Sequence, residues 1–272
     1  MSQTVFVPAR ARLCRARVLS TIRLSSRYFL LRIVRPDEMP ASAPGQFVHV
    51  AVPPGGRFFL RRPLSIHNCD DNALELLIVE AGEGTRRMRR LASGDSLDFY
   101  GPLGGAFPRS VTRVLAIGGG VGLAPLYYYG RRNAGGFRGT YRLLYGARTR
   151  DDLFLEHVPL EAQGVGLATD DGSYGFAGNV VSLAAAELDR DEADVLFSCG
   201  PTVMMRAVQR LADERGLAHY ASLENRMACA LGACRACVVP VRGARGREFR
   251  TVCHDGPVFD GSVLDWDGLP VP

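Results

Sequence analysis

The chain has 272 residues, of which 47% are hydrophobic and 22% are charged, and its formal net charge is +5 at pH 7. This composition is that of a soluble globular protein, and the length allows two or three domains of ordinary size. All 33 basic residues are arginine and none of their clusters matches a nucleic-acid-binding motif, while no apolar run reaches the ~18 residues that a membrane span needs. We therefore expect neither a nucleic-acid nor a membrane partner.

Residues 1–108 predict a small antiparallel β-barrel. Short β-rich segments recur at 15–25, 28–36, 46–52, 63–69, 74–80 and 96–103, with Gly, Pro, Asp and Asn between them. Evenly spaced short strands with such turn residues are typical of a barrel. One short helix over 85–91 is expected to interrupt the strands.

Residues 109–220 predict an open α/β domain that binds a nucleotide. Buried strands are expected at 114–117, 141–146, 165–169 and 194–199, with helices after the first glycine turn and at 151–158, 178–188 and 201–215. Alternating strands and helices imply a parallel sheet with crossover helices. Residues 221–272 show little regular pattern, and we expect a small domain that a metal site organises.

Four of the seven cysteines lie in this last segment, separated by four, two and fifteen residues: Cys229, Cys234, Cys237 and Cys253. The opening C-x4-C-x2-C is the spacing of plant-type ferredoxins, so we predict a 2Fe-2S cluster with these four thiolates as its ligands. Gly232 and the neighbouring alanines let the backbone close tightly on the cluster. A structural four-cysteine zinc site and plain buried thiols are the alternatives.

The remaining cysteines, Cys14, Cys69 and Cys199, form no evident disulfide framework. This pattern favours a reducing compartment, and the N-terminus lacks an uninterrupted apolar segment after its charges. We therefore expect a cytoplasmic protein.

Two short motifs in the barrel region have the chemistry of a flavin nucleotide site. In Arg62-Pro63-Leu64-Ser65 the arginine can fork onto a phosphate, and the serine hydroxyl can hydrogen-bond a ring nitrogen. Gly84-Thr85 follows a glycine turn at a helix start, where free N–H groups can face a pyrophosphate. A surface arginine beside a strand-edge proline, and a glycine turn with a threonine cap, are the bland interpretations.

A third motif, Gly118-Gly119-Gly120-Val121-Gly122, follows the first α/β strand and precedes a helix. The context is that of a dinucleotide fingerprint, although Leu123 replaces its third glycine. We predict that Gly118, Gly119, Gly120 and Gly122 bind NAD. No acidic residue ends the second strand, so the choice between NAD and NADP is open.

Cys199 lies at the end of another strand, in the crevice where open α/β sheets bind ligands. It is a candidate to contact the nicotinamide ring. An isolated cysteine is more often a small buried hydrophobe.

Taken together, these motifs resemble the electron transfer subunits of class 1B dihydroorotate dehydrogenases, within the ferredoxin-reductase superfamily. The resemblance covers residues 10–260 and is carried by a set of motifs: PGQFV (44–48), RRPLSI (61–66), GEGT (82–85), YGPLGGAF (100–107), GGGVGLAPL (118–126), TDDGSYG (169–175), SCGPTVMM (198–205) and the cysteine run.

The resemblance implies which residues contact FAD: Arg62, Pro63, Leu64, Ser65, Leu77, Ile78, Val79, Gly84 and Thr85. It also implies that the four cysteines bind the 2Fe-2S cluster. Ser65 and Cys199 are the candidate catalytic residues. Val79 departs from a frequent arginine, which weakens the expectation of a phosphate contact there. Gly105-Ala106 and Ala230-Leu231 also depart from the family pattern, and we interpret these two departures as changes in packing.

The implied function is electron transfer in pyrimidine biosynthesis. NADH delivers two electrons as a hydride, a 2Fe-2S cluster takes one at a time, and a flavin can do both. In the family, the cluster connects FAD to the FMN of a separate catalytic subunit that oxidises dihydroorotate, in a heterotetramer of two of each. A reductase subunit of a ferredoxin-, hydrogenase- or sulfide-linked complex is the alternative, and a non-enzymatic zinc-bound interaction subunit is a further one.

Overall fold

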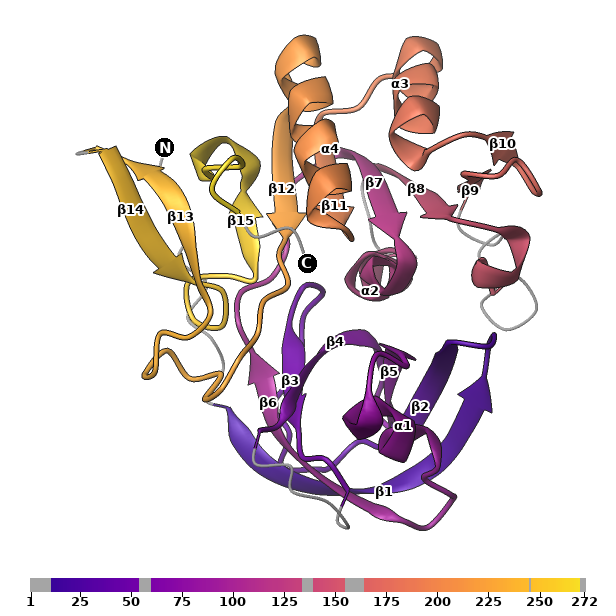
Figure 1. The fold of residues 1–272 in the computed structure, drawn as a ribbon, viewed down its shortest axis with the longest axis vertical. Coiled ribbons are helices and arrows are strands. Elements are labelled where there is room, and N and C mark those ends of the chain that lie inside the picture. The colour runs from indigo at the N-terminus through magenta and orange to yellow at the C-terminus, as the bar shows by residue number, and fades with distance from the viewer. Residues whose placement is uncertain (1–10, 54–59, 134–138, 155–163, 245, 270–272) are drawn as a thin grey trace.

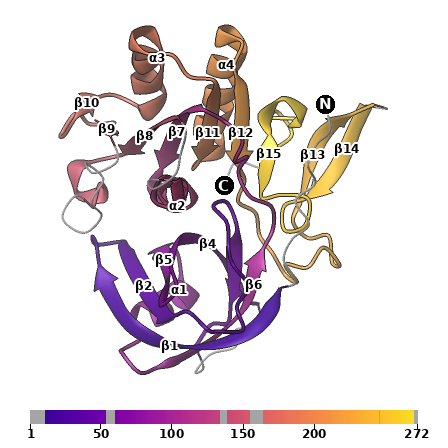
Figure 2. The same ribbon diagram turned by 180° about the vertical axis from the view of Figure 1, so that it is seen from behind.

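The structure is a computed structural model and describes residues 11–53, 60–133, 139–154, 164–244 and 246–269. These residues form a closed barrel, a seven-stranded sheet flanked by helices, and a two-stranded hairpin. Figures 1 and 2 show the barrel below the sheet, with one helix between them and the hairpin to one side. The expected fold class, a barrel followed by an α/β domain and a C-terminal cluster segment, is confirmed.

The barrel strands run in the order β1-β2-β5-β4-β3-β6, and each pairs with its neighbours in antiparallel fashion. They are β1 (Arg12–Arg23), β2 (Tyr28–Val34), β3 (Phe47–Val50), β4 (Arg62–Cys69), β5 (Ala73–Val79) and β6 (Ser96–Leu103). In β1 the side chains of Cys14, Ala16 and Val18 point into the core, because alternate residues of a strand face opposite sides. All six expected strands are present.

Helix α1 (Glu83–Arg89) packs on the barrel through Met88, which belongs to the barrel core. It begins two residues before the expected start at residue 85. Gly82 is the N-cap residue, and Thr85 lies in the first turn, from which its side chain caps the helix start by accepting the Gly82 N–H. The Thr85 hydroxyl accepts hydrogen bonds from the N–H groups of Ala81 and Gly82 and donates one to the Gly82 carbonyl.

The second sheet has the order β10-β9-β8-β7-β11-β12-β15. Its strands are β7 (Arg113–Gly119), β8 (Thr140–Ala147), β9 (Val165–Thr169), β10 (Phe176–Ala177), β11 (Val195–Cys199), β12 (Ala218–Ser222) and β15 (Val258–Asp260). All pair in parallel except β15, which is antiparallel to β12. The carboxyl ends of β7 and β11 point toward the barrel in Figure 1.

Helix α2 (Leu123–Asn133) covers the face of this sheet that is turned to the barrel, and α3 (Val180–Arg190) and α4 (Thr202–Arg215) cover the other face. The core under α2 also includes Leu30 and Leu77 from the barrel. The two domains therefore share one apolar core, and this core fixes how the barrel and the carboxyl edge of the sheet face each other.

The prediction of a helix over 151–158 is wrong for residues 151–154, the part that the structure describes. The 3-10 turn η2 (Arg150–Asp152) stands there, and Phe154 has a φ of 55°, outside the helical region. Residues 155–163, which hold the rest of the expected helix, lie outside the described residues.

The C-terminal segment has more regular structure than its sequence indicated. Strands β13 (Val238–Gly243) and β14 (Gly246–Thr251) form a hairpin, and β15 with the 3-10 turn η4 (Gly261–Val263) joins the edge of the α/β sheet. The expectation of little regular pattern is wrong, because pairing partners distant in sequence create these strands. Strand β12 spans residue 220, at which we expected the α/β domain to end.

A third core links the cluster segment to both domains. Phe47 and Leu103 of the barrel pack with Met205 of α4, Leu223 and Val239. All three parts of the chain thus meet around one junction. In the described part of the chain, no helix is both long and apolar enough to cross a membrane.

Candidate functional site

Three of the four cysteines lie on the loop between β12 and β13, and Cys253, which follows β14, packs against that loop. Five backbone N–H groups donate to their sulfur atoms at 3.3–3.5 Å, and they come from Leu231, Gly232, Cys234, Ala236 and Cys253. Cys253 is joined to the others in both directions, since its sulfur accepts from Gly232 and its N–H donates to the Cys237 sulfur. The most distant cysteine in sequence is thereby tied to the loop.

The backbone of this loop explains how so many N–H groups reach the sulfurs. Ala230, Gly232 and Arg235 have φ values of 56°, 80° and 55°. Left-handed residues interspersed among ordinary ones turn successive N–H groups toward one side of the chain, which is the geometry of an anion-binding nest. Two of the three are not glycine, and left-handed backbone costs such residues free energy. The loop is thus shaped around its sulfur atoms.

The sulfurs lie in two pairs. The Cys229 thiol is within hydrogen-bond reach of Cys234, and the Cys253 thiol is within reach of Cys237. The N–H groups of Cys234 and Leu231 lower the pKa of Cys229 to about 7, whereas burial raises the pKa of Cys253 to about 12. Protons must leave these thiols when a metal binds.

This pairing separates a binuclear cluster from a single zinc ion. A tetrahedral zinc site draws four thiolates onto one point. Two thiol pairs held by N–H groups fit a cluster with two irons better than they fit zinc.

Arg62 and Gly84, which come from separate sequence motifs, are in contact. The Nε and Nη2 atoms of Arg62 lie 3.3 Å from the position that a Cβ at Gly84 would occupy. The glycine therefore leaves room for the guanidinium at the first turn of α1. Arg62 also donates to the Leu60 carbonyl at 2.6 Å through Nη1. Its guanidinium group is thereby held beside the N-terminal N–H groups of α1, which have no partner within the helix.

Ser65 lies on β4 opposite Phe47 of β3, while Leu64 packs against the barrel core. Ser65 is half-buried, and its hydroxyl makes no hydrogen bond to any residue that the structure describes. A free hydroxyl at this place is suited to a ligand atom. The side chains of Leu77 and Ile78 are buried in the two cores and Val79 is half-buried, so a ligand would meet the backbone of the first two.

The glycine motif of the α/β domain packs directly against the turn that carries Cys199. Gly118 and Gly119 end β7, and the 3-10 turn η1 (Gly120–Gly122) follows. A Cβ at Gly122 would lie 2.1 Å from the Cys199 carbonyl oxygen. The two predicted NAD motifs are therefore side by side at the carboxyl edge of the sheet, where open α/β sheets bind ligands.

Cys199 itself is 1% exposed. Burial raises its pKa far above the usual range, the Glu224 carboxylate raises it further, and the Ser222 hydroxyl partly opposes the shift. The thiol is therefore neutral at physiological pH. It can pack against a ring but cannot act as a thiolate nucleophile.

Two residues near this crevice were missed in the sequence analysis. Glu224 follows β12 and part of its surface is exposed to solvent. The protein atoms packed around it displace part of its hydration, and this desolvation raises the pKa of the carboxyl group. Tyr28, the first residue of β2, places its hydroxyl 3.3 Å from the position of a Cβ at Gly120. Tyr28 stands in none of the motifs, so no local signal could have found it, whereas Glu224 belongs to the run that carries the four cysteines, from which only the thiols were taken as site residues.

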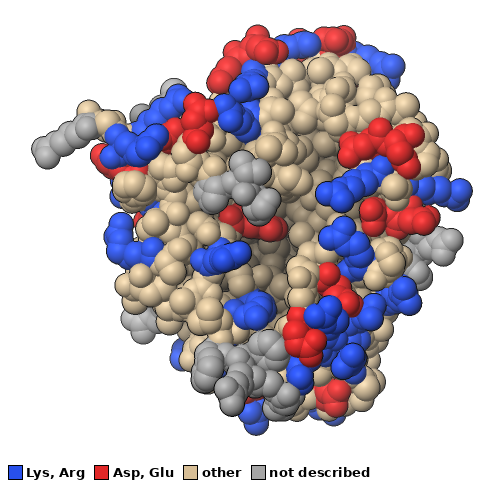
Figure 3. Space-filling model, viewed as in Figure 1, with Lys and Arg blue, Asp and Glu red and all other residues tan. Residues whose placement is uncertain are grey.

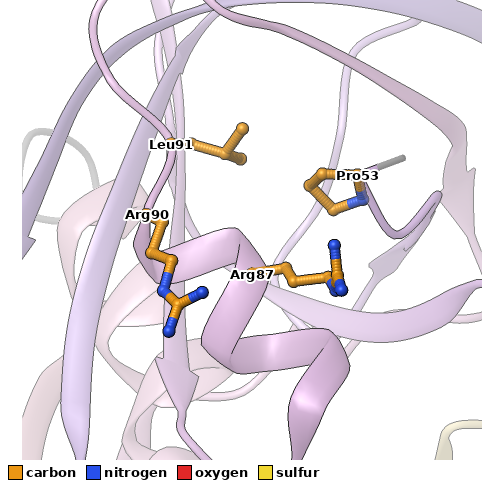
Figure 4. Close-up of a pocket in the computed structure, with 4 residues that line it drawn as sticks. All are labelled: Pro53, Arg87, Arg90 and Leu91. Atoms are coloured by element: carbon orange, nitrogen blue, oxygen red, sulfur yellow. The ribbon is translucent and has the colours of Figure 1, made fainter. Parts of the chain in front are cut away.

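Figure 3 shows a hollow between the barrel and the α/β domain, with an acidic patch on its floor and arginines on its rims. A separate small pocket of about 220 Å³ lies beside α1 and is lined by Pro53, Arg87, Arg90 and Leu91 (Figure 4). It contains none of the predicted site residues.

Comparisons with known proteins agree with this arrangement. Residues 224–265 match the family model described as the iron-sulfur cluster binding domain of dihydroorotate dehydrogenase B. The chain is 42% identical over 226 residues to the dihydroorotate dehydrogenase B (NAD(+)) electron transfer subunit of Shouchella clausii, covering 80% of this chain and 85% of the relative. It is 37% identical over 253 residues to that of Geobacillus thermodenitrificans, covering 90% and 95%.

A solved chain from the structure of an NADH-dependent reduced ferredoxin-NADP oxidoreductase has the same fold. It superposes with a TM-score of 0.80 at 29% identity, covering 93% of this chain and 90% of the other.

Proposed function

We propose that this chain, which belongs to the family of dihydroorotate dehydrogenase B (NAD(+)) electron transfer subunits, passes electrons between the FMN of a separate catalytic subunit and NAD. The observation that supports this most is that three candidate sites lie on parts of the chain that pack together. The Arg62–Gly84 contact, the Gly122–Cys199 contact and the cysteine loop lie on parts of the chain that share packed cores.

The cofactors are FAD, a 2Fe-2S cluster and NAD. A bound flavin accepts a hydride and gives up its electrons one at a time, which neither of the other two can do. In this proposal Arg62 holds the FAD phosphates and Ser65 hydrogen-bonds the flavin ring. Gly118, Gly119, Gly120 and Gly122 let the dinucleotide approach the backbone, and the neutral Cys199 thiol packs against the nicotinamide.

The partner is a catalytic subunit, and we propose that it carries FMN and forms a heterotetramer with two copies of each chain. We also retain the division into 1–108, 109–220 and 221–272 as a functional one. A cytoplasmic location suits the seven cysteines, all of which are free thiols here.

The proposal is tested with the purified chain and its partner. The chain alone is expected to pass electrons from NADH to artificial acceptors but to show no oxidation of dihydroorotate. Addition of the FMN-containing subunit encoded beside it should give a stable complex that forms orotate with NAD+. A cognate pair that forms no orotate, or a native complex built around a ferredoxin-, hydrogenase- or sulfide-linked subunit, would refute the dihydroorotate assignment.

The FAD site is tested by two substitutions, one expected to impair FAD retention and the other to impair NADH oxidation. Arg62→Ala is expected to weaken FAD retention, because it removes a charge-assisted contact worth roughly 1.5–3 kcal/mol. Ser65→Ala should retain FAD but slow NADH oxidation. FAD content is measured by absorbance after gel filtration, and rates by stopped flow. If both variants keep full FAD and normal rates, the barrel face carrying β4 is not the flavin site.

A further inference from the structure

We propose that Tyr28, a barrel residue, belongs to the dinucleotide site and donates its hydroxyl to a phosphate oxygen of the bound NAD. This inference rests on the proposed use of the glycine turn for NAD and adds to that site a residue from the other domain. The argument depends on where the Tyr28 ring packs, where its hydroxyl points and what surrounds it.

The ring of Tyr28 reaches from the barrel to the α/β domain. Its centroid lies 4.7 Å from that of Phe154, with the planes inclined by 57°, and Phe154 in turn lies 5.9 Å from Tyr145 of β8. Both views of the fold show the tip of the β1–β2 hairpin beside the segment that follows β8 (Figures 1 and 2). This packing fixes the direction of the phenol.

The hydroxyl ends at the glycine turn. It lies 3.3 Å from the position of a Cβ at Gly120, whose φ of +57° is left-handed. The turn stands at the carboxyl edge of the sheet and opens into η1. The hydroxyl is therefore close enough to contact a group bound at this turn.

The hydroxyl is also without a partner among the residues that the structure describes. Buried tyrosine hydroxyls ordinarily find one. Four other tyrosines of these cores do, namely Tyr128 with Ser42, Tyr129 with the Pro108 carbonyl, Tyr141 with the Leu126 carbonyl and Tyr145 with the Asp152 carbonyl. Tyr28 is only half-buried, and its hydroxyl is not among the sealed polar atoms without partners, so it has access to solvent in the crevice. A free donor at this position is available to a ligand.

Two arginines and two carboxylates surround Tyr28, so that a neutral donor stands in a site without a large net charge. Burial raises the pKa of Tyr28, with a contribution from Asp152, while Arg27 and Arg148 lower it and Glu224 raises it slightly. The phenol is therefore protonated at physiological pH and can donate. Arg148, which directly follows β8, and Arg27 offset the negative charge of Asp152 and Glu224 near the hydroxyl.

The competing view is that Tyr28 only spaces the two domains through its stacking on Phe154. Tyr28→Phe separates the two roles, because it keeps the ring and removes only the hydroxyl. Tyr220→Phe is the matched control: Tyr220 is another half-buried tyrosine, it stacks edge-on against Phe197, and it lies near Asp260 and away from the glycine turn.

The experiment uses holoprotein and measures the Kd of NAD+ and of ADP-ribose by calorimetry, with KM and kcat for NADH and an artificial acceptor. For Tyr28→Phe we expect both Kd values and KM to rise on the order of tenfold, as for a lost hydrogen bond to a charged group, with the effect on KM rather than kcat. Flavin and iron content and the melting temperature should match those of the wild type, and Tyr220→Phe should leave the Kd unchanged.

Equal Kd values for Tyr28→Phe and the wild type would overturn the inference while leaving the proposed function intact. A loss seen with NAD+ but not with ADP-ribose would also overturn it, since the contact would then be with the nicotinamide half. Failure of the wild type to bind either nucleotide would instead refute the proposed function itself. A parallel loss with Tyr220→Phe would show that the effect is not specific to this hydroxyl.

Discussion

Cys253→Ala is expected to abolish the cluster and to leave the FAD site intact. Cys253 is the only one of the four cysteines that lies beyond the β13–β14 hairpin, and its two hydrogen bonds, to Gly232 and Cys237, hold the segment after β14 against the loop. Its removal takes away one ligand and the N–H contact of Gly232. The electron paramagnetic signal of the reduced protein and the iron content should both fall to background, while FAD remains bound.

Cys69→Ala is the matched control. Cys69 is also a buried free thiol, but it belongs to β4 and the barrel core. Its replacement should keep full iron content and cost only the modest stability of a small core cavity. An undiminished signal in Cys253→Ala, with two irons per chain, would contradict the ligand assignment.

The barrel and most of the α/β sheet could be predicted because their signals are local. In β1 the alternation of buried and exposed residues is visible in the sequence, and in β7 a continuous apolar run precedes the glycine turn. Strand β12 escaped prediction because buried polar residues break its apolar run. His219 is 2% exposed and is satisfied by Ser198 and Gln209, partners that are distant in sequence.

The candidate site likewise divides into features with a local sequence signal and features that depend on the fold. Motifs on contiguous residues could be proposed from the sequence, since their spacing indicates the chemistry. Which motifs touch could not be predicted, because the Arg62–Gly84 and Gly122–Cys199 contacts depend on strand order and domain packing. Tyr28 and Glu224 became candidates only once the chain had brought them to the crevice.

The Gly122–Cys199 contact carries the second large expected effect. In Gly122→Ala the new Cβ would lie 2.1 Å from the Cys199 carbonyl oxygen, 2.3 Å from its carbon and 2.6 Å from the Gly200 nitrogen. These are backbone atoms at the end of a central strand, so they cannot move aside as a flexible side chain would. We expect a loss of about 3 kcal/mol or more in unfolding free energy, at the upper end of overpacking costs, together with loss of measurable NAD+ binding.

Gly105→Ala provides the comparison, because the nearest atom to its new Cβ would be the Gly256 carbonyl oxygen at 3.6 Å, an ordinary contact. This variant should melt within a degree or two of the wild type and bind NAD+ normally, since a surface-type change alters stability by about 0.5 kcal/mol or less. Denaturant unfolding and calorimetric titration give both quantities for each variant. Should Gly122→Ala unfold and bind NAD+ like Gly105→Ala, the glycine turn would not be packed on the Cys199 strand as described, and the dinucleotide site would have to be placed elsewhere.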